Sequence, residues 1–468
     1  MTLSQYDIAQ QTERLLRRRW LVWAVLAFCF AIVFFHRVSL AVVSDQLMAE
    51  FNLGAAALGN LGAVYFYVYT AMQIPSGILA DTTGPRLTVT AGMLLAAMGA
   101  AVFALAQSLA VATAGRFLTG LGVSVVFVSV QKAQTFWFRP QEFATITGFT
   151  STVGNTGAIL AATPLAFLVA AIGWRNSFLV VAVLGLIGSL ACWLLVRDQP
   201  QNLGLPSIAE LEAYEAGAKP PVNQPATAVP FRQALSQVLH NRYFIPLFVA
   251  ALGFNGALLS LTSMWGIPYL MQVYGLGRTE ASTYSLLAGL GTVISGPLSG
   301  LISDRLQRRK PVLLTFCALP LIAWSILVLW PGKISLPLLK PVFFLAGLGT
   351  GGYLTVMVLT KELNPPAIAG LATGTVNTGA FLGAAILQPL VGFVLDATWD
   401  GTVAAGVPLY SLTGFRRGFS ICLLTVAVAY LTALRLPETG ARHLLTDDDL
   451  LREHPAIGGR YESTDLEP

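Results

Sequence analysis

The sequence predicts an all-α membrane protein in which twelve transmembrane helices form two pseudo-symmetric six-helix bundles. Three observations indicate this fold: the chain carries few charges, it contains twelve long apolar segments, and short motifs of its first half return in its second half. Only 11% of the 468 residues are charged, and 55% are hydrophobic. Soluble domains carry about 25% charged residues, so a chain of this composition must expose most of its surface to lipid.

The apolar segments are long enough to cross a bilayer as helices, since about 20 residues span its hydrocarbon core. The mean hydropathy of the chain is +0.68. Transmembrane strands are not expected, because they would appear as alternating segments of about 10 residues. The predicted spans are residues 20–43, 56–79, 87–107, 110–131, 145–172, 176–196, 243–271, 281–302, 311–331, 337–360, 369–395 and 418–436.

Basic residues predict the orientation of these spans. With the N-terminus inside, 20 of the 28 Lys and Arg residues fall in inner loops and tails and 6 in outer loops. Cytoplasmic loops carry such an excess, so both termini are expected in the cytoplasm of a protein in the cell (cytoplasmic or inner) membrane. The net charge of +5 therefore reflects topology, and no nucleic-acid partner is expected.

The predicted organisation has five parts. A polar, proline-rich linker separates two six-helix bundles, as surface loops of this composition do. The four cysteines lie in apolar segments without a CxxC pair, so no disulfide and no metal site is expected. The parts are a cytoplasmic N-terminus (1–19), the first bundle (20–196), the linker (197–242), the second bundle (243–436) and a cytoplasmic tail (437–468).

Three motifs occur in corresponding spans of both halves, at offsets of 222 to 227 residues. Such repeats indicate a duplicated bundle, which in transporters binds its substrate between the halves and exposes it to each side in turn. The pairs are SGILAD (76–81) with SGLISD (299–304), FLTGLG (117–122) with FLAGLG (344–349), and NTGA (155–158) with NTGA (377–380).

The loop GILADTTGPR (77–86) resembles the G-x-x-x-D-x-x-G-x-R loop of the major facilitator superfamily, and residues 303–310 resemble a weaker second copy. Arg116 and the glycines after it resemble the pattern of that family's fourth span. The resemblance implies the family's fold and a gate at this loop. Asp81 is expected to pair with Arg86 and with a neighbouring helix, and Gly84 to permit the tight turn. The alternative is a loop that only fixes topology. The gate residues are Gly77, Asp81, Gly84, Arg86, Gly300, Asp304 and Arg305.

Arg37 is the principal candidate for substrate binding, because charges inside a membrane are costly and by default functional. The stretch HRVSL (36–40) resembles the D-R-V-N-L stretch of the anion:cation symporters, the sialin-like and hexonate carriers. That resemblance implies that Arg37 faces the central cavity. The planar guanidinium suits a carboxylate, to which it donates two parallel hydrogen bonds. The alternatives are snorkelling to the outer headgroups and a structural pair with Asp45.

His36 and Arg116 are candidates for coupling transport to a proton or another cation. His36 stands where the symporters often have an aspartate, and histidine titrates near neutral pH. A hydrogen-bonded packing role is the alternative for His36, and packing against a carbonyl is the alternative for Arg116.

Polar side chains in other spans are candidates to complete the site, with helix–helix hydrogen bonding as the alternative. Tyr65, Tyr69 and Gln73 share one predicted helix face at spacings of four residues. The others are Asn155, Trp265, Tyr269, Tyr353 and Asn377.

The predicted function is secondary active transport of a small organic anion by alternating access. A nitrate/nitrite porter and a drug or metabolite exporter of the same superfamily are alternatives, and a transporter-like sensor is a remote one. The nitrate group has an arginine in each of spans 2 and 8, whereas residues 56–79 and 281–302 contain none. No enzyme activity and no cofactor are expected. The expected partners are the lipid bilayer and a small anionic substrate, bound by a monomer.

Overall fold

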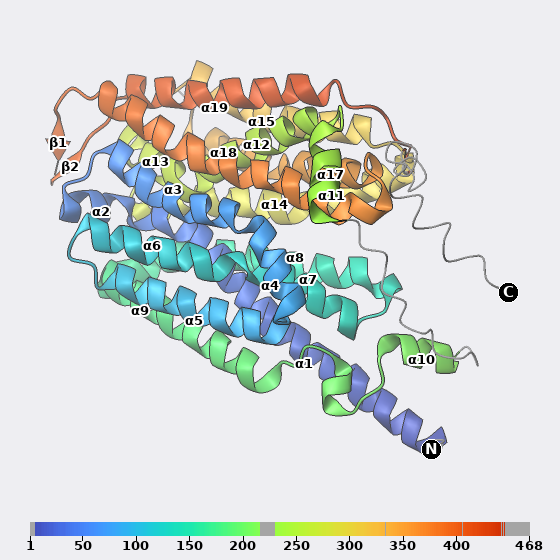
Figure 1. Cartoon of the computed structure of the whole chain (residues 1–468). Helices are drawn as coiled ribbons and strands as arrows, with labels where there is room; N and C mark the ends of the chain where they lie inside the picture. Colours follow the sequence, from blue (N-terminus) through green and yellow to red (C-terminus); the bar gives the residue numbers. More distant parts are fainter. Residues whose placement is uncertain are drawn as a thin grey trace. The chain divides into compact units, whose positions relative to one another are not determined.

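The computed structural model describes residues 5–215, 230–332, 334–404, 406–440, 442 and 444. Parts of the predicted linker (197–242) and tail (437–468) therefore lie outside the described residues. The described part of the chain is almost wholly helical (Figure 1), which agrees with the predicted all-α class. It also contains a small antiparallel hairpin of β1 (Val403–Ala404) and β2 (Val407–Pro408), which the sequence did not indicate.

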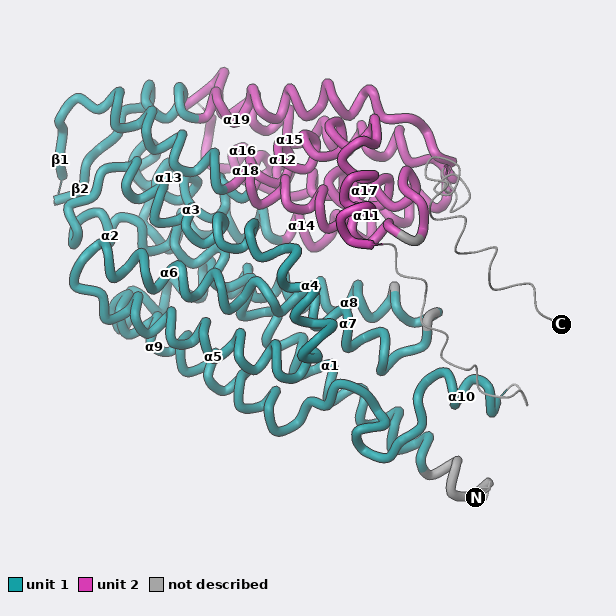
Figure 2. The backbone as a smooth tube through the Cα atoms, viewed as in Figure 1, with its two compact units in different colours: residues 1–224, 259–289, 385–418 teal, residues 225–258, 290–384, 419–468 magenta. Residues whose placement is uncertain are grey.

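The chain forms two compact units (Figure 2). Unit 1 comprises residues 1–224, 259–289 and 385–418, and unit 2 comprises residues 225–258, 290–384 and 419–468. These units are defined by how compactly their residues pack, not by the repeated motifs. The division of the chain into two repeated halves, 20–196 and 243–436, therefore stays a prediction.

Most helices belong to one unit, whereas α12, α14, α18 and α19 contribute to both. The helices up to the linker are α1 (Gln5–Val38), η1 (Ser39–Val43), α2 (Ser44–Phe51), α3 (Ala55–Ala71), α4 (Gln73–Thr82), α5 (Pro85–Ala104), α6 (Leu109–Ser124), α7 (Val126–Trp137), η2 (Pro140–Glu142), α8 (Phe143–Leu160), α9 (Thr163–Leu195), η3 (Pro200–Leu203) and α10 (Ile208–Glu215). Those after it are α11 (Phe231–His240), α12 (Phe244–Ser260), the π-helical turn η4 (Leu261–Trp265), α13 (Gly266–Tyr274), α14 (Arg278–Leu306), α15 (Lys310–Leu329), α16 (Leu336–Leu348), α17 (Thr350–Glu362), η5 (Pro366–Ile368), α18 (Ala369–Ala397) and α19 (Leu412–Ala433).

The predicted apolar segments coincide with helices. Within the described residues, 10 stretches are long and apolar enough to cross a membrane. One of them, 145–195, holds two predicted spans, which Gly173 divides by adopting a φ of +78°. The predicted span 56–79 is divided between α3 and α4 at Met72, so neither helix is long enough alone. Helix length therefore agrees with many spans, while their number of twelve stays a prediction.

Glycine permits close helix packing within unit 1. A Cβ added at Gly122 of α6 would lie 2.3 Å from the carbonyl oxygen of Gly92 in α5. A Cβ at Gly157 of α8 would lie 1.9 Å from the carbonyl oxygen of Ala31 in α1. Small residues at these crossings allow the backbones to approach closely, as in other membrane helix bundles.

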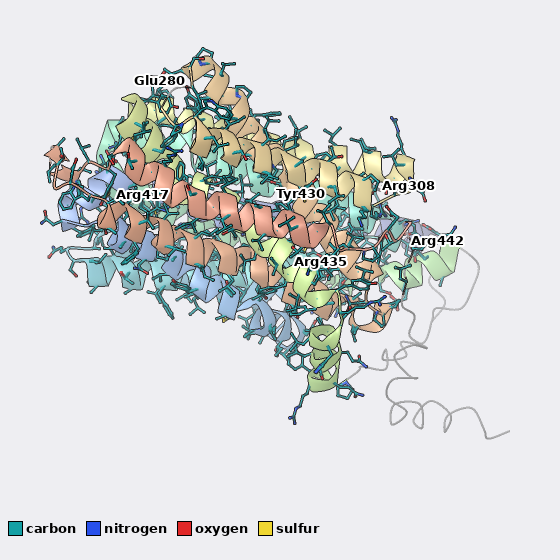
Figure 3. The ribbon with its side chains drawn as sticks, turned by 90° about the horizontal axis from the view of Figure 1, so that it is seen from above. Glu280, Arg308, Arg417, Tyr430, Arg435 and Arg442 are labelled. Carbon is teal, nitrogen blue, oxygen red and sulfur yellow. The ribbon has the colours of Figure 1, made fainter. Side chains whose placement is uncertain are left out.

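The outer faces of the helices are apolar. On α9, Leu186, Leu190 and Leu194 lie one turn apart and are each more than half exposed, which is typical of a lipid-facing surface. Basic residues lie at helix ends instead. In unit 2, Arg308 and Arg442 lie at the same end of the helices (Figure 3). Arg308 belongs to a loop predicted as cytoplasmic, and Arg442 belongs to the predicted cytoplasmic tail.

Candidate functional site

The last turn of α1 carries a buried basic pair. His36 is 1% exposed and Arg37 is 8% exposed, and the α-helix ends directly after them at Val38. Phe34 lies three residues before Arg37, and its ring centroid is 4.3 Å from the guanidinium carbon. A cation over an aromatic face at this distance is attracted by the ring quadrupole, most strongly when water is excluded.

Two tyrosines of α3 meet this arginine. The rings of Tyr65 and Tyr69 are stacked, with centroids 6.0 Å apart and planes 20° from parallel. The guanidinium carbon of Arg37 lies 5.5 Å from the Tyr69 ring, and the guanidinium hydrogen-bonds to both phenol oxygens. The Tyr65 hydroxyl also donates to the carbonyl of Val33, at 3.3 Å. The structure therefore brings together Arg37 and two of the three predicted members of the α3 stripe.

Arg116 of α6 reaches the same tyrosines from another side. Its side chain is buried, and its guanidinium carbon lies 5.1 Å from the Tyr65 ring. Its Nη1 donates to the carbonyl oxygen of His36 at 3.2 Å, which is the carbonyl contact named as its alternative. Among the described residues of unit 1, the buried Asp, Glu, Lys, Arg and His side chains are His36, Arg37 and Arg116. This cluster of three groups is therefore wholly basic.

The other predicted site residues of unit 1 make different contacts. Gln73 is the first residue of α4, directly after the turn residue Met72 that separates α3 from α4. Asn155 donates to the Ser151 carbonyl of its own helix, at 2.9 Å. Trp265 is buried on the π-helical turn and donates to a backbone carbonyl of α18 at 2.9 Å. Tyr269 packs against the rings of Tyr274 and Phe415.

In unit 2, two predicted site residues contact each other. The hydroxyl of Tyr353 on α17 donates to the side-chain oxygen of Asn377 on α18. Both side chains are half-buried. They form a polar pair between helices of the same unit.

Two polar contacts lie at one end of unit 1, where α2 and the β1–β2 hairpin are found (Figure 1). We call this end the α2 end. Asp45 of α2 pairs with Arg278 of α14, at 2.6 Å. Asp396 of α18 accepts hydrogen bonds of 2.8 Å from the backbone amides of Ala55 and Ala56, which begin α3. Asp45 therefore pairs with Arg278 and not with Arg37, the partner considered from the sequence.

Two further features fix the position of the Asp396 side chain: a hydrogen bond from Tyr410 and the close approach of Gly54. The Tyr410 hydroxyl donates to its Oδ1 at 2.6 Å. Burial, followed by this hydrogen bond and the charge of Asp396, raises the pKa of Tyr410 above its ordinary value. A Cβ at Gly54 would lie 2.8 Å from the carboxylate, so a larger residue there would displace Asp396.

The loop between α4 and α5 corrects one predicted pairing. Asp81 pairs with Lys132 of α7 at 2.7 Å, not with Arg86. Arg86 donates to the carbonyl of Trp193 at 2.7 Å, and its backbone amide donates to Asp198 at 2.7 Å. Arg86 is thereby directed toward α9, away from Asp81. Gly84 adopts a φ of +81°, which confirms the predicted tight turn, and Gly77 has open space around it.

The second copy of this loop lies in unit 2. Asp304 pairs with Arg309 at 3.0 Å, and the same guanidinium reaches Glu362 of α17, also at 3.0 Å. Arg305, the predicted gate residue, is exposed, and Gly300 has open space around it. Glu438 accepts hydrogen bonds from the backbone amides of Arg309 and Lys310, at 2.8 and 3.0 Å.

Several of these residues escaped the sequence analysis. Phe34 looked like an ordinary apolar residue, although its spacing of three from Arg37 was a usable signal. Lys132 and Asp396 were also not among the predicted site residues. Neither has a local pattern that reveals its distant partner.

The described residues thus define a polytopic helical membrane protein with a buried basic cluster and polar contacts at helix ends. The model of the Major Facilitator Superfamily matches residues 24–388. The chain belongs to this superfamily of membrane proteins, whose members are not enzymes.

Curated relatives match most of the chain. The probable sulfoacetate transporter of Cupriavidus necator is 25% identical, over 82% of this chain and 89% of the relative. The probable galactarate/D-glucarate transporter of Bacillus subtilis is 23% identical, over 81% and 86%. A membrane sensor protein of Escherichia coli is 25% identical, over 82% and 89%. Relatives named for organic acids agree with the resemblance to the anion:cation symporter group.

A solved structure supports the fold. The crystal structure of a D-xylose-proton symporter superposes with a TM-score of 0.68 at 14% identity, over 91% of this chain and 99% of that protein.

Proposed function

We propose that the chain is a secondary active transporter that carries a small organic anion across the cytoplasmic (inner) membrane. The observation that carries this proposal is the basic cluster of Arg37 and Arg116 around the stacked Tyr65 and Tyr69 rings. Buried cations attract an anionic ligand strongly, because the surrounding dielectric is low. The phenol hydroxyls lie beside the guanidinium, so a carboxylate bound there has several hydrogen-bond donors within reach.

We further propose that transport proceeds by alternating access between the halves 20–196 and 243–436. The pairs Asp45–Arg278 and Asp396–Ala55 join residues of these two halves, which supports a role in closing the α2 end. The excess of Lys and Arg in the opposite loops supports an outward-facing α2 end and cytoplasmic termini. His36 and Arg116 are the proposed coupling groups, with a proton or another cation as the coupled ion.

The names of relatives support an anionic substrate, and one of them also supports a second candidate function. The sulfoacetate and galactarate/D-glucarate transporters are named for organic acids. The sensor relative favours the alternative that this chain binds an anion without carrying it. Binding without transport in the assay below would favour that alternative.

The experiment is uptake into proteoliposomes with and without a proton gradient. Sulfoacetate and D-glucarate are the anionic probes, and D-xylose is the neutral control. The proposal expects uptake of at least one anion, faster with the gradient, and none of xylose. Arg37→Gln should abolish this uptake, whereas Arg17→Gln should not, because Arg17 is exposed and pairs with Glu13 of the same helix, α1. Uptake of xylose and of neither anion would overturn the proposal.

A further inference from the structure

An amide of α18 is buried with its hydrogen-bonding groups unused. Gln388 is 0% exposed, and neither its side-chain Nε2 nor its Oε1 has a hydrogen-bond partner among the described residues. An amide offers two donors and an acceptor. Burying all of them unpaired costs the full desolvation of the group. Such a group requires an explanation, and a ligand that arrives during function is one.

The backbone around Gln388 is held firmly. The indole of Trp265 donates to the Gln388 carbonyl at 2.9 Å. A Cβ at Gly59 of α3 would lie 2.6 Å from that carbonyl oxygen. The donor Trp265 ends a π-helical turn, an irregularity that is frequent at functional sites. The backbone that carries the amide is therefore fixed by these neighbours, while the side-chain Nε2 and Oε1 are left without hydrogen-bond partners among the described residues.

The amide lies next to the basic cluster. A Cβ at Gly62 would lie 2.7 Å from Gln388 Oε1 and 3.4 Å from a methyl carbon of Leu40. Gly62 precedes Tyr65 by three residues on α3, and Leu40 follows Arg37 by three residues. Three residues are about one helical turn, or about 5 Å along the axis. Gln388 thus approaches from α18 about one turn nearer the α2 end than Arg37 and Tyr65.

We propose that Gln388 determines specificity by hydrogen-bonding a hydroxyl group of an anion whose carboxylate is held at Arg37. A hydroxyl donates one hydrogen bond and accepts others, which matches an amide and not a second charge. One helical turn corresponds to a few bonds of a small ligand. The ligand class is therefore a hydroxylated carboxylic acid. This inference rests on the proposed function, because it takes the anion site at Arg37 as its reference point.

The test compares two carboxylates of equal length, gluconate and hexanoate, of which only the first carries hydroxyls. Affinities are measured by calorimetry on the purified full chain. The wild type should prefer gluconate at least about tenfold, because a site built to bond a hydroxyl rejects an analogue without one. Gln388→Leu should remove most of this preference by weakening gluconate alone. An unchanged preference in Gln388→Leu, or none in the wild type, would overturn the proposal.

Stability separates this role from a structural one. Without ligand, Gln388→Leu should raise the melting temperature, because it removes unpaired polar atoms and keeps the volume. Gln134→Leu is the matched control. Gln134 is equally buried, but its Nε2 donates to Thr150 and its Oε1 accepts from Thr147. That variant should lower the melting temperature and leave the gluconate preference intact. A melting temperature lowered in Gln388→Leu would show a packing role and overturn the inference.

The outcomes also separate this inference from the proposed function. Arg37→Gln should weaken gluconate and hexanoate equally. If it weakens neither, the anion site itself is wrong. If Arg37→Gln weakens both ligands but Gln388→Leu keeps the preference for gluconate, the anion site is supported and the proposed role of Gln388 is wrong.

Discussion

Asp396 accepts a hydrogen bond of 2.8 Å from the backbone amide of Ala55, the first residue of α3. The first amides of a helix have no partner within the helix and carry a partial positive charge. A carboxylate there is therefore bound both by hydrogen bonds and by the helix dipole. Ala55 and Asp396 belong to opposite predicted halves. Under the proposed alternating-access mechanism, this contact would exist only while the α2 end is closed.

Asp396→Ala should open the α2 end more often. It removes the hydrogen bond from Tyr410 and the two charge-assisted hydrogen bonds from the α3 amides. The latter two are together worth about 2 kcal/mol or more at a half-buried site, and 1.4 kcal/mol corresponds to tenfold in an equilibrium. The readout is the labelling rate of Leu40→Cys by an impermeant maleimide, in a background without the four native cysteines. Leu40 is 1% exposed, so labelling reports opening. The rate should rise by about 30-fold, the equivalent of about 2 kcal/mol.

Asp400→Ala is the matched control for this measurement. Asp400 lies in the neighbouring loop, where it accepts a hydrogen bond from the Thr402 amide at 3.0 Å. Its removal should not change the labelling rate. Equal rates in the two alanine variants would show that Asp396 does not hold the α2 end closed.

The Asp81–Lys132 pair should affect turnover and not affinity. Both side chains are more than one-third exposed, so the pair is worth at most about 1 kcal/mol. Asp81→Asn should change the transport rate by up to about fivefold while the substrate affinity stays constant. The charge swap of Asp81→Lys with Lys132→Asp should restore the rate, and failure of that rescue would exclude the pair as a latch. Arg86→Gln should not reproduce the effect of Asp81→Asn, because Arg86 binds the Trp193 carbonyl and not Asp81.

His36→Gln tests coupling. If the imidazole gains and loses a proton during transport, the glutamine variant should show uptake that varies little between about pH 5 and 8, where histidine ordinarily titrates. Glutamine keeps a polar side chain of similar length, so folding should be preserved. Uptake at each pH into liposomes with a fixed gradient provides the measurement. A pH profile identical to that of the wild type would remove His36 from the coupling mechanism.

Glu438 should contribute a pH-dependent part of the stability of unit 2. Burial raises the pKa of its carboxyl, but hydrogen bonds from the amides of Arg309, Gly440 and Lys310 lower the pKa more, so that it lies below the ordinary 4.5. A lowered pKa in the folded state adds stability above the ordinary pKa, which is lost as the pH falls through the folded value. Glu438→Gln should therefore lower the melting temperature at neutral pH.

The difference between the melting temperatures of Glu438→Gln and the wild type should shrink as the pH falls below about 4. Glu13→Gln provides the comparison, because Glu13 is exposed and pairs with Arg17 of the same helix. A difference that is constant with pH would assign the effect to packing instead of charge.

Local signals account for what the sequence predicted well. Gly84 was recognised because a left-handed turn residue is nearly always glycine, and Arg37 because charges within spans are rare. The break between α3 and α4 has a local cause as well. Pro75 cannot continue a regular helix, since its ring clashes with the carbonyl four residues earlier, at Ala71, and α3 ends there.

Distant partners account for what was missed. Asp81 and Lys132 are 51 residues apart, and Asp396 binds amides about 340 residues away. No local pattern encodes such pairings, because they depend on how whole helices pack. Gln388 is neutral and mid-span, so a search for charges passes over it. Its significance lies in the absence of hydrogen-bond partners among the described residues, which only a structure reveals.

Arg37 decides the substrate class. Its guanidinium lies against Phe34 and Tyr69 and hydrogen-bonds to the tyrosines of α3, a setting in which a bound carboxylate gains a bidentate, partly desolvated partner. Arg37→Gln should weaken anion binding by about 2–5 kcal/mol, the cost of truncating a buried charged pair. Arg37→Lys should restore only part of the lost binding, because a point charge replaces the planar fork.

Calorimetry with an organic anion measures the affinities of both Arg37 variants, and Arg17→Gln should bind the anion as the wild type does. If Arg37→Gln binds and transports normally while a neutral or cationic compound is the preferred ligand, the organic-anion assignment is wrong. Membership of the superfamily would stand, since it rests on the match over residues 24–388.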